Sequence, residues 1–178
     1  MPRLFTGLEI PAELGVRLSM LRGGLFGATW IDPENYHITL RFVGDIDDRT
    51  AEEVASELGR IRRRAFEVSL EEIDSFGGRQ PHSVVAKVGA KNGIMELQAE
   101  HERVMQRLGL EPEPRRFTPH VTIARTKGAS NRAVADWLAI RGGLFGAQFK
   151  AARFVLFSSR SSRGGGPYVI EESYPLAA

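Results

Sequence analysis

Two short segments carry the residues best suited to chemistry, His37-Ile38-Thr39-Leu40 and His120-Val121-Thr122-Ile123. Each reads histidine, aliphatic residue, threonine, aliphatic residue. In a β-strand, residues two apart point to the same face, so each histidine shares a face with its threonine while the aliphatic residues point to the core. Two such strands that face each other would bring two imidazoles and two hydroxyl groups into one cleft.

This set of groups suits attack on a phosphodiester without a metal. One neutral imidazole can deprotonate water while the other, protonated, donates to the leaving alkoxide, and each transfer contributes roughly 100- to 10,000-fold in rate. The hydroxyls of Thr39 and Thr122 can donate to the non-bridging phosphate oxygens. Purely structural histidines and a two-histidine metal site are the alternatives. No Asp, Glu or Cys lies at ligand-like spacing beside either motif, so we expect no metal and no cofactor.

The elements that must position these motifs follow from periodicity. Alternation predicts strands over residues 3–10, 36–43, 66–76, 83–88, 117–125, 148–157 and 168–173. Helical spacing and capping residues predict helices that begin near residues 11, 47, 93 and 130. Each half therefore reads roughly strand–helix–strand–helix–strand. We expect an α+β fold and a single domain, residues 1–178, of two pseudo-symmetric lobes.

Charge is distributed unevenly along the 178 residues. Residues 1–114 carry 14 basic and 19 acidic side chains, whereas residues 115–163 carry ten basic ones and only Asp136 as an acid. The whole chain has a net charge of +2, and 20 of its 24 basic residues are arginine. Such a basic half suggests a surface that meets an anion such as a nucleic acid, or else a face balanced by acidic neighbours in the fold.

Absent residue types narrow the function classes further. There is no cysteine, which excludes disulfides, thiolate metal sites and cysteine nucleophiles. Glu9 and Pro11 interrupt any signal-peptide core, and no apolar stretch approaches the roughly 20 residues that span a bilayer. We therefore expect a cytoplasmic protein with no membrane association.

The motifs and their surroundings resemble the 2H phosphoesterase superfamily, in particular its LigT/ThpR branch of RNA 2′,3′-cyclic phosphodiesterases, also called 2′–5′ RNA ligases. The resemblance covers essentially the whole chain. It includes the opening strand at residues 3–11, the blocks around the two motifs at residues 30–44 and 116–125, and Gly166-Pro167-Tyr168 near the last strand.

The resemblance implies a bilobal fold with antiparallel sheets lining a central cleft and helices outside. It also implies hydrolysis of an RNA-terminal 2′,3′-cyclic phosphate to a 2′-phosphomonoester, without metal. By analogy, His37 would be the general acid at the departing 3′ oxygen, His120 the base for water, and Arg125 a phosphate clamp. RNA with a cyclic phosphate end, or a cyclic nucleotide, would be the substrate of a protein that we expect to be a monomer.

Strict alternation makes separate predictions for three residues near the motifs. Arg125 falls on the face opposite His120, so it reaches the cleft only if the strand ends or twists near Ala124. Arg41 falls on the face of His37, where it would be a weaker phosphate contact or a solvated strand residue. Phe42, a candidate for base stacking by position, falls with the core.

The other distinctive residues receive structural interpretations. His101 lies on an apolar helical stripe and is expected to pack in the core, and His82 is expected at the surface, where it could border the cleft. The sequence Arg-Gly-Gly-Leu-Phe-Gly-Ala occurs at residues 22–28 and again at 141–147, each time as a helix exit. Residues 160–167 could offer backbone N–H groups or arginines to RNA phosphates, or form a flexible hairpin connection.

Three functions remain open from the residues. The first is cyclic phosphodiester hydrolysis. The second is 2′–5′ RNA ligation or the opening of another small cyclic phosphate. The third is a non-catalytic protein that binds RNA ends through its arginine-rich half.

Overall fold

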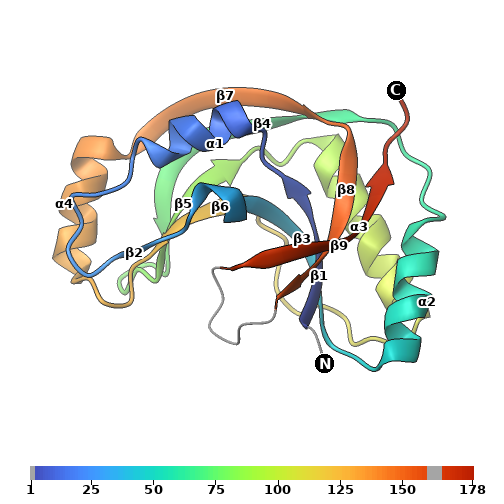
Figure 1. Cartoon of the computed structure of the whole chain (residues 1–178). Helices are drawn as coiled ribbons and strands as arrows, with labels where there is room; N and C mark the ends of the chain where they lie inside the picture. Colours follow the sequence, from blue (N-terminus) through green and yellow to red (C-terminus); the bar gives the residue numbers. More distant parts are fainter. Residues whose placement is uncertain (1–2, 160–165) are drawn as a thin grey trace.

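In the computed structural model, which describes residues 3–159 and 166–178, every named strand belongs to one antiparallel sheet that carries helices on its outer side (Figure 1). The strands are β1 (Arg3–Glu9), β2 (Thr29–Trp30), β3 (His37–Asp45), β4 (Phe66–Phe76), β5 (Ser83–Val88), β6 (His120–Arg125), β7 (Gly143–Ala151), β8 (Arg153–Ser159) and β9 (Tyr168–Pro175). The α-helices are α1 (Ala12–Ser19), α2 (Asp48–Leu58), α3 (Asn92–Arg107) and α4 (Asn131–Arg141), and a short 3₁₀ turn, η1, spans Pro33–Asn35.

The sheet has a narrow seam at its centre. Its order is β7-β4-β5-β6-β3-β1-β8-β9, with β2 on the far end of β6, and β3 meets β6 at one register pair, Ile38 with Val121. We call β1, β3, β8 and β9 with α2 and α3 the His37 lobe, and β2 and β4–β7 with α1 and α4 the His120 lobe (Figure 1). The prediction of an α+β fold with two similar lobes is confirmed.

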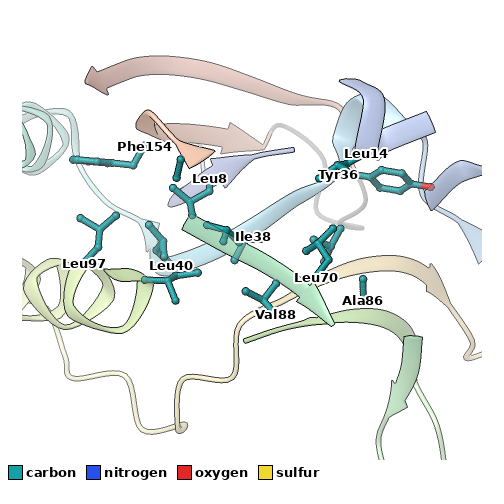
Figure 2. Close-up of a cluster of buried hydrophobic side chains, with 14 of the residues drawn as sticks. Leu8, Leu14, Tyr36, Ile38, Leu40, Leu70, Ala86, Val88, Leu97 and Phe154 are labelled. Carbon is teal, nitrogen blue, oxygen red and sulfur yellow. The ribbon is translucent and has the colours of Figure 1, made fainter. Parts of the chain in front are cut away.

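One hydrophobic core runs beneath both lobes. Ile38 is fully buried at the seam, between Leu8 and Leu40 on one side and Leu70 and Ala86 on the other (Figure 2). The aliphatic residues of the motifs therefore anchor both motif strands in the same core. Burial of each such side chain stabilises the fold by about 1.5–3 kcal/mol, which holds the two polar faces in register.

The lobes do not coincide with the two halves of the chain. The first half contributes β4 and β5 to the His120 lobe, and the second half contributes β8 and β9 to the His37 lobe. The expected single strand over residues 148–157 is wrong for this reason: it is two strands, β7 and β8, separated at Ala152 and placed in different lobes. Ala151 and Phe154, on either side of the break, are both buried. The apolar pattern of the sequence therefore does not show where the first strand ends and the second begins.

One local prediction needs adjustment. Apolar spacing after Asp47 predicts a helix through about Arg63, but α2 ends at Leu58; its N-cap is Asp47, as expected, whose carboxylate accepts a hydrogen bond of 2.7 Å from the backbone N–H of Thr50. Of the connection at residues 160–167, residues 160–165 lie outside the described part of the chain.

The repeated heptapeptide adopts two conformations. Residues 22–28 form a connection after α1, whereas residues 141–147 begin at the last residue of α4 and continue as β7. Both copies are helix exits, as expected. They also contact each other, because the Arg141 guanidinium donates to the carbonyl oxygen of Arg22 at 3.4 Å. Pairing of β7 with β4 supplies the partner that makes only the second copy a strand.

Candidate active site

Each motif histidine is anchored in the same way. The Nδ1 atom of His37 lies 2.8 Å from the carbonyl oxygen of Asn35, and that of His120 lies 2.7 Å from the carbonyl oxygen of Thr118. A carbonyl oxygen only accepts, so Nδ1 carries the proton in both rings. In the neutral imidazole Nε2 is then the basic nitrogen, and it is the atom left to exchange protons.

Both motifs present their polar face to one cleft of about 700 Å³. The antiparallel register about the pair of Ile38 and Val121 sets His37 across from Thr122 and Thr39 across from His120. This arrangement is close to twofold symmetric, and all four polar side chains line the cleft. The structure thus brings together the two histidines and two threonines that the motifs predicted.

Thr39 makes a direct contact with its histidine. Its Oγ1 atom lies 3.0 Å from Nε2 of His37. When the imidazole is neutral, the hydroxyl donates to Nε2; when it is protonated, Nε2–H donates to the hydroxyl oxygen. Thr39 can therefore accompany a change of protonation at His37 while remaining beside the cleft.

The two imidazoles have different surroundings. The His37 ring lies among Phe5, Phe157 and Tyr168, with centroid distances of 5.0, 5.6 and 4.8 Å. Burial lowers the pKa of His37 to about 4, although the hydrogen bond to the Asn35 carbonyl opposes this and nearby His120 adds to it.

His120 has an edge-on contact with one ring, that of Phe76, at 4.7 Å. Burial also lowers the pKa of His120, with a smaller opposing effect from the Thr118 carbonyl and a further lowering from His82. In the free protein His37 is therefore neutral at pH 7.

A β-bulge brings Arg125 into the cleft. In the pairing of β5 with β6, Val85 faces Thr122 and Val84 faces Ala124, so Ile123 is the extra residue. Ile123 and Ala124 are both buried, and the alternation shifts by one from there. Arg125 consequently lines the cleft with His120 and Thr122. The strand departs from ideal alternation next to Ala124, as the Arg125 prediction required.

A second bulge stands at the same place in the other motif and bears on the predictions for Arg41 and Phe42. In the pairing of β1 with β3, Gly7 faces Thr39 and Thr6 faces Arg41, so Leu40 is the extra residue. Arg41 is only 7% exposed and its guanidinium contacts Glu102 of α3, so it is not a solvated strand residue, yet it still lines the cleft; a weaker contact with phosphate stays a prediction.

The expectation that Phe42 belongs to the core is wrong for the same reason. It is 45% exposed, lines the cleft and contacts the ring of Phe5 at 5.8 Å. Phe42 and Arg125 each stand five residues after their histidine, so the cleft has an aromatic ring on one side of the seam and a cation on the other.

The remaining histidines lie where the sequence placed them. His101 is fully buried in α3, and its Nδ1 lies 2.7 Å from the hydroxyl of buried Thr6. His82 is exposed at the border of the cleft.

Sequence reasoning missed several residues that line the cleft. Tyr168 arrives from β9, and Arg115 and Arg116 arrive from the connection before β6. The basic composition of residues 115–163 was the available signal for the two arginines, since they and Arg125 are three of its ten cations.

Two absences within residues 3–159 and 166–178 bear on the kind of site. No group of three or more His, Cys, Asp or Glu side chains there is arranged to hold a metal ion. None of the helices in the same ranges is both long enough and apolar enough to cross a bilayer.

Fold and site together define a two-lobed protein with a pair of histidines, one from each lobe, in a shared cleft. The family model described as "LigT like Phosphoesterase" matches the chain twice, at residues 8–86 and 87–168. The chain belongs to this family.

Curated relatives extend the similarity to other organisms. An RNA 2′,3′-cyclic phosphodiesterase of Aeropyrum pernix is 39% identical over 104 residues, which cover 57% of this chain and 58% of that protein. The protein of the same name from Thermotoga maritima is 33% identical over 135 residues, 70% of each chain. The one from Methanocaldococcus jannaschii is 25% identical over 174 residues, 96% of this chain and 99% of that one.

Solved structures show the same fold. E. coli LigT complexed with 3′-AMP superposes with a TM-score of 0.81 at 23% identity and full coverage of both chains. The Thermus thermophilus protein TT0787 gives 0.81 at 22% identity, with 97% of each chain covered.

Proposed function

We propose that this protein hydrolyses RNA-terminal 2′,3′-cyclic phosphates to 2′-phosphomonoesters by acid–base catalysis between His37 and His120, without a metal. The observation that carries the proposal is the matched anchoring of the two imidazoles, which leaves both Nε2 atoms for proton transfer at one cleft. The curated relatives named above bear the name of this activity.

The reaction uses both histidines in opposite roles. Nε2 of His120 takes a proton from water as the water oxygen attacks phosphorus. The bond from phosphorus to the 3′ oxygen breaks, and that oxygen takes a proton from Nε2 of His37. The product carries the phosphate on its 2′ oxygen, His120 leaves the step protonated, His37 leaves it neutral, and exchange with solvent restores both.

His37 must be protonated before the step begins, and its pKa of about 4 in the free protein opposes this. The negative charge of the bound phosphate works against the effect of burial and raises the pKa of the imidazole beside it. Substrate binding and protonation of the acid are therefore coupled. In the empty cleft, where no phosphate charge is present, burial keeps His37 in its neutral form, which cannot act as the acid.

Three further side chains suit the same substrate. The hydroxyls of Thr39 and Thr122 and the guanidinium of Arg125 can donate to the phosphate oxygens, where negative charge increases in the transition state. The ring of Phe42 is exposed in the cleft against the Phe5 ring, which also contacts His37, and a nucleobase can stack on it. An anion site next to a flat apolar surface is what a nucleotide end needs.

The test is turnover of an oligonucleotide with a 2′,3′-cyclic phosphate in the presence of EDTA. We expect hydrolysis to the 2′-phosphate by the wild-type protein. We also expect a loss of roughly 100- to 10,000-fold in kcat/KM for His37→Ala and for His120→Ala separately. Full activity in both variants would overturn the proposal.

The same experiment separates the alternative functions. A joined product with a 5′-hydroxyl RNA would indicate ligation, whereas RNA binding without turnover that survives loss of both histidines would indicate an end-binding protein. The cytoplasmic location and the monomeric state expected from the sequence stay predictions.

A further inference from the structure

One wall of the cleft is a connection without helix or strand. Residues 109–119 link α3 to β6, and five of them line the cleft: Glu113, Arg115, Arg116, Phe117 and Thr118. The connection leads directly into His120, and the carbonyl of Thr118 holds that ring. The end next to His120 has an anchor of its own, a hydrogen bond of 3.0 Å from the backbone N–H of Val88 to the carbonyl oxygen of Pro119, so the position of the earlier part of the connection matters chiefly for the arginines.

Two side chains outside this connection hold it at two backbone points. The Nη2 atom of Arg41 donates to the carbonyl oxygen of Glu111 at 2.6 Å. The Oε1 atom of Glu102 accepts from the backbone N–H of Glu113 at 3.0 Å. Arg41 and Glu102 are themselves paired, and Arg41 also donates to the carbonyl oxygen of Phe42. One ion pair, with Arg41 buried and Glu102 partly buried, thus joins β3, α3 and the cleft wall.

Stability alone is a poor explanation for this pair. Replacing a buried ion pair with apolar side chains is often neutral or stabilising, because taking both charges out of water is costly. The planar guanidinium, however, has donors for Glu102, Glu111 and Phe42 at once, in fixed directions. What the pair provides is a defined position for the wall.

The wall carries cations that the reaction centre does not need. Glu113 accepts hydrogen bonds of 3.1 Å from both the backbone N–H and Nε of Arg115, which fixes that side chain at the rim. Arg116 is exposed beside it. Arg125 already lines the cleft with His120 and Thr122, so Arg115 and Arg116 suit phosphates other than the one that reacts.

We propose that Arg41 and Glu102 are positioning residues that fix this wall, residues 109–119, as a binding site for RNA phosphates upstream of the cyclic end. The inference rests on the proposed function and deepens it, because it makes an oligonucleotide the substrate class rather than a mononucleotide. Arg115 and Arg116 contact the upstream phosphates, and Arg41 acts through them.

The test compares two substrates, a 2′,3′-cyclic mononucleotide and a short oligonucleotide with the same cyclic end. We expect Arg41→Met to raise KM for the oligonucleotide roughly 10- to 100-fold, the range for loss of charged hydrogen bonds, with kcat nearly unchanged. KM for the mononucleotide should change little. The double variant Arg115→Gln/Arg116→Gln should show the same selectivity, and adding Arg41→Met to it should have little further effect.

Arg63→Met is the matched control. Arg63 pairs with Glu96 and Glu100 of the same helix α3, but it does not line the cleft. Its loss should lower stability without changing KM for either substrate. Arg41→Lys, which keeps the charge but has one nitrogen for three acceptors, should restore part of the oligonucleotide affinity.

The outcomes separate this inference from the proposed function. Turnover of neither substrate by the wild-type protein would overturn the proposed function. Two results would overturn only the positioning role. One is that the wild-type protein turns over both substrates and Arg41→Met changes their KM values equally. The other is that Arg115→Gln/Arg116→Gln leaves KM for the oligonucleotide unchanged. If Arg41→Met does not fold, Glu102→Gln is measured in its place and must show the same rise in KM for the oligonucleotide.

Discussion

Sulfate should bind in the cleft with uptake of a proton at His37. The pKa of about 4 in the free protein leaves about 1% of this imidazole protonated at about pH 6. A unit negative charge about 4 Å away, at an effective dielectric constant of about 20, stabilises the imidazolium by about 4 kcal/mol. That energy favours the protonated imidazole roughly 1,000-fold, which changes the protonated fraction at about pH 6 from about 1% to about 90%.

The measurement is calorimetric titration with sulfate at about pH 6 in two buffers that differ in ionisation enthalpy. Sulfate keeps its charge in this range, so the buffer dependence of the observed enthalpy counts protons taken up by the protein. His37→Gln should lower the number of protons taken up per sulfate bound by about 0.9, because His37 changes from about 1% to about 90% protonated in the wild-type protein. Wild-type affinity should fall as pH rises from about 4 to about 7, because binding takes up protons throughout that range.

The control is His120→Gln, in which sulfate binding should still be accompanied by proton uptake at His37. An unchanged proton count in His37→Gln would refute the reasoning, because it would mean that anion binding leaves the buried imidazole neutral.

Three further predictions follow from single residues. Arg125→Gln should raise KM for a cyclic mononucleotide roughly 10- to 100-fold and weaken the dependence of KM on salt, and a loss confined to kcat would count against a phosphate clamp. Gly7→Ala would place a Cβ atom 2.6 Å from the carbonyl oxygen of Ile38, so we expect a loss of roughly 1–3 kcal/mol in a thermal unfolding experiment; an unchanged Tm would contradict it. Burial lowers the pKa of His101 to about 3, so the unfolded state binds more protons between about pH 3 and 6.5 and stability rises with pH across that window. His101→Leu should remove about 2 kcal/mol of the stability lost between pH 7 and pH 5 in urea unfolding, and a variant as acid-sensitive as the wild type would argue against this assignment.

The centre of the site could be predicted from the sequence because its geometry is local. Residues two apart in a strand share a face whatever the strand pairs with, so alternation put His37 with Thr39 and His120 with Thr122. The pairing of the two motif strands at the seam then follows from having one motif in each lobe.

The edges of the site could not be predicted because they depend on neighbouring strands. A bulge exists only relative to a partner, and the extra residues, Leu40 and Ile123, look like any aliphatic strand residue. Past the bulge at Leu40, alternation put Phe42 in the core, whereas this ring lines the cleft. Gly7 was the sequence feature that could have indicated the bulge at Leu40. A side chain at this position would collide with the carbonyl oxygen of Ile38 on the paired strand.

The order of the strands could not be predicted from the sequence for a related reason. Two identical heptapeptides become a connection and a strand, and one apolar stretch becomes β7 and β8. In both cases the outcome is decided by pairing partners far away in the sequence.

The single pair of residues at the seam has a mechanical consequence. If one lobe rocks against the other, the pivot lies at Ile38 and Val121. His37 and His120 are their immediate neighbours and so have the shortest lever arms, which keeps the distance between the two imidazoles nearly constant. Residues farther from the pivot, at the rim of the cleft, travel most. The position of the seam therefore fixes the spacing of the two imidazoles against any such movement.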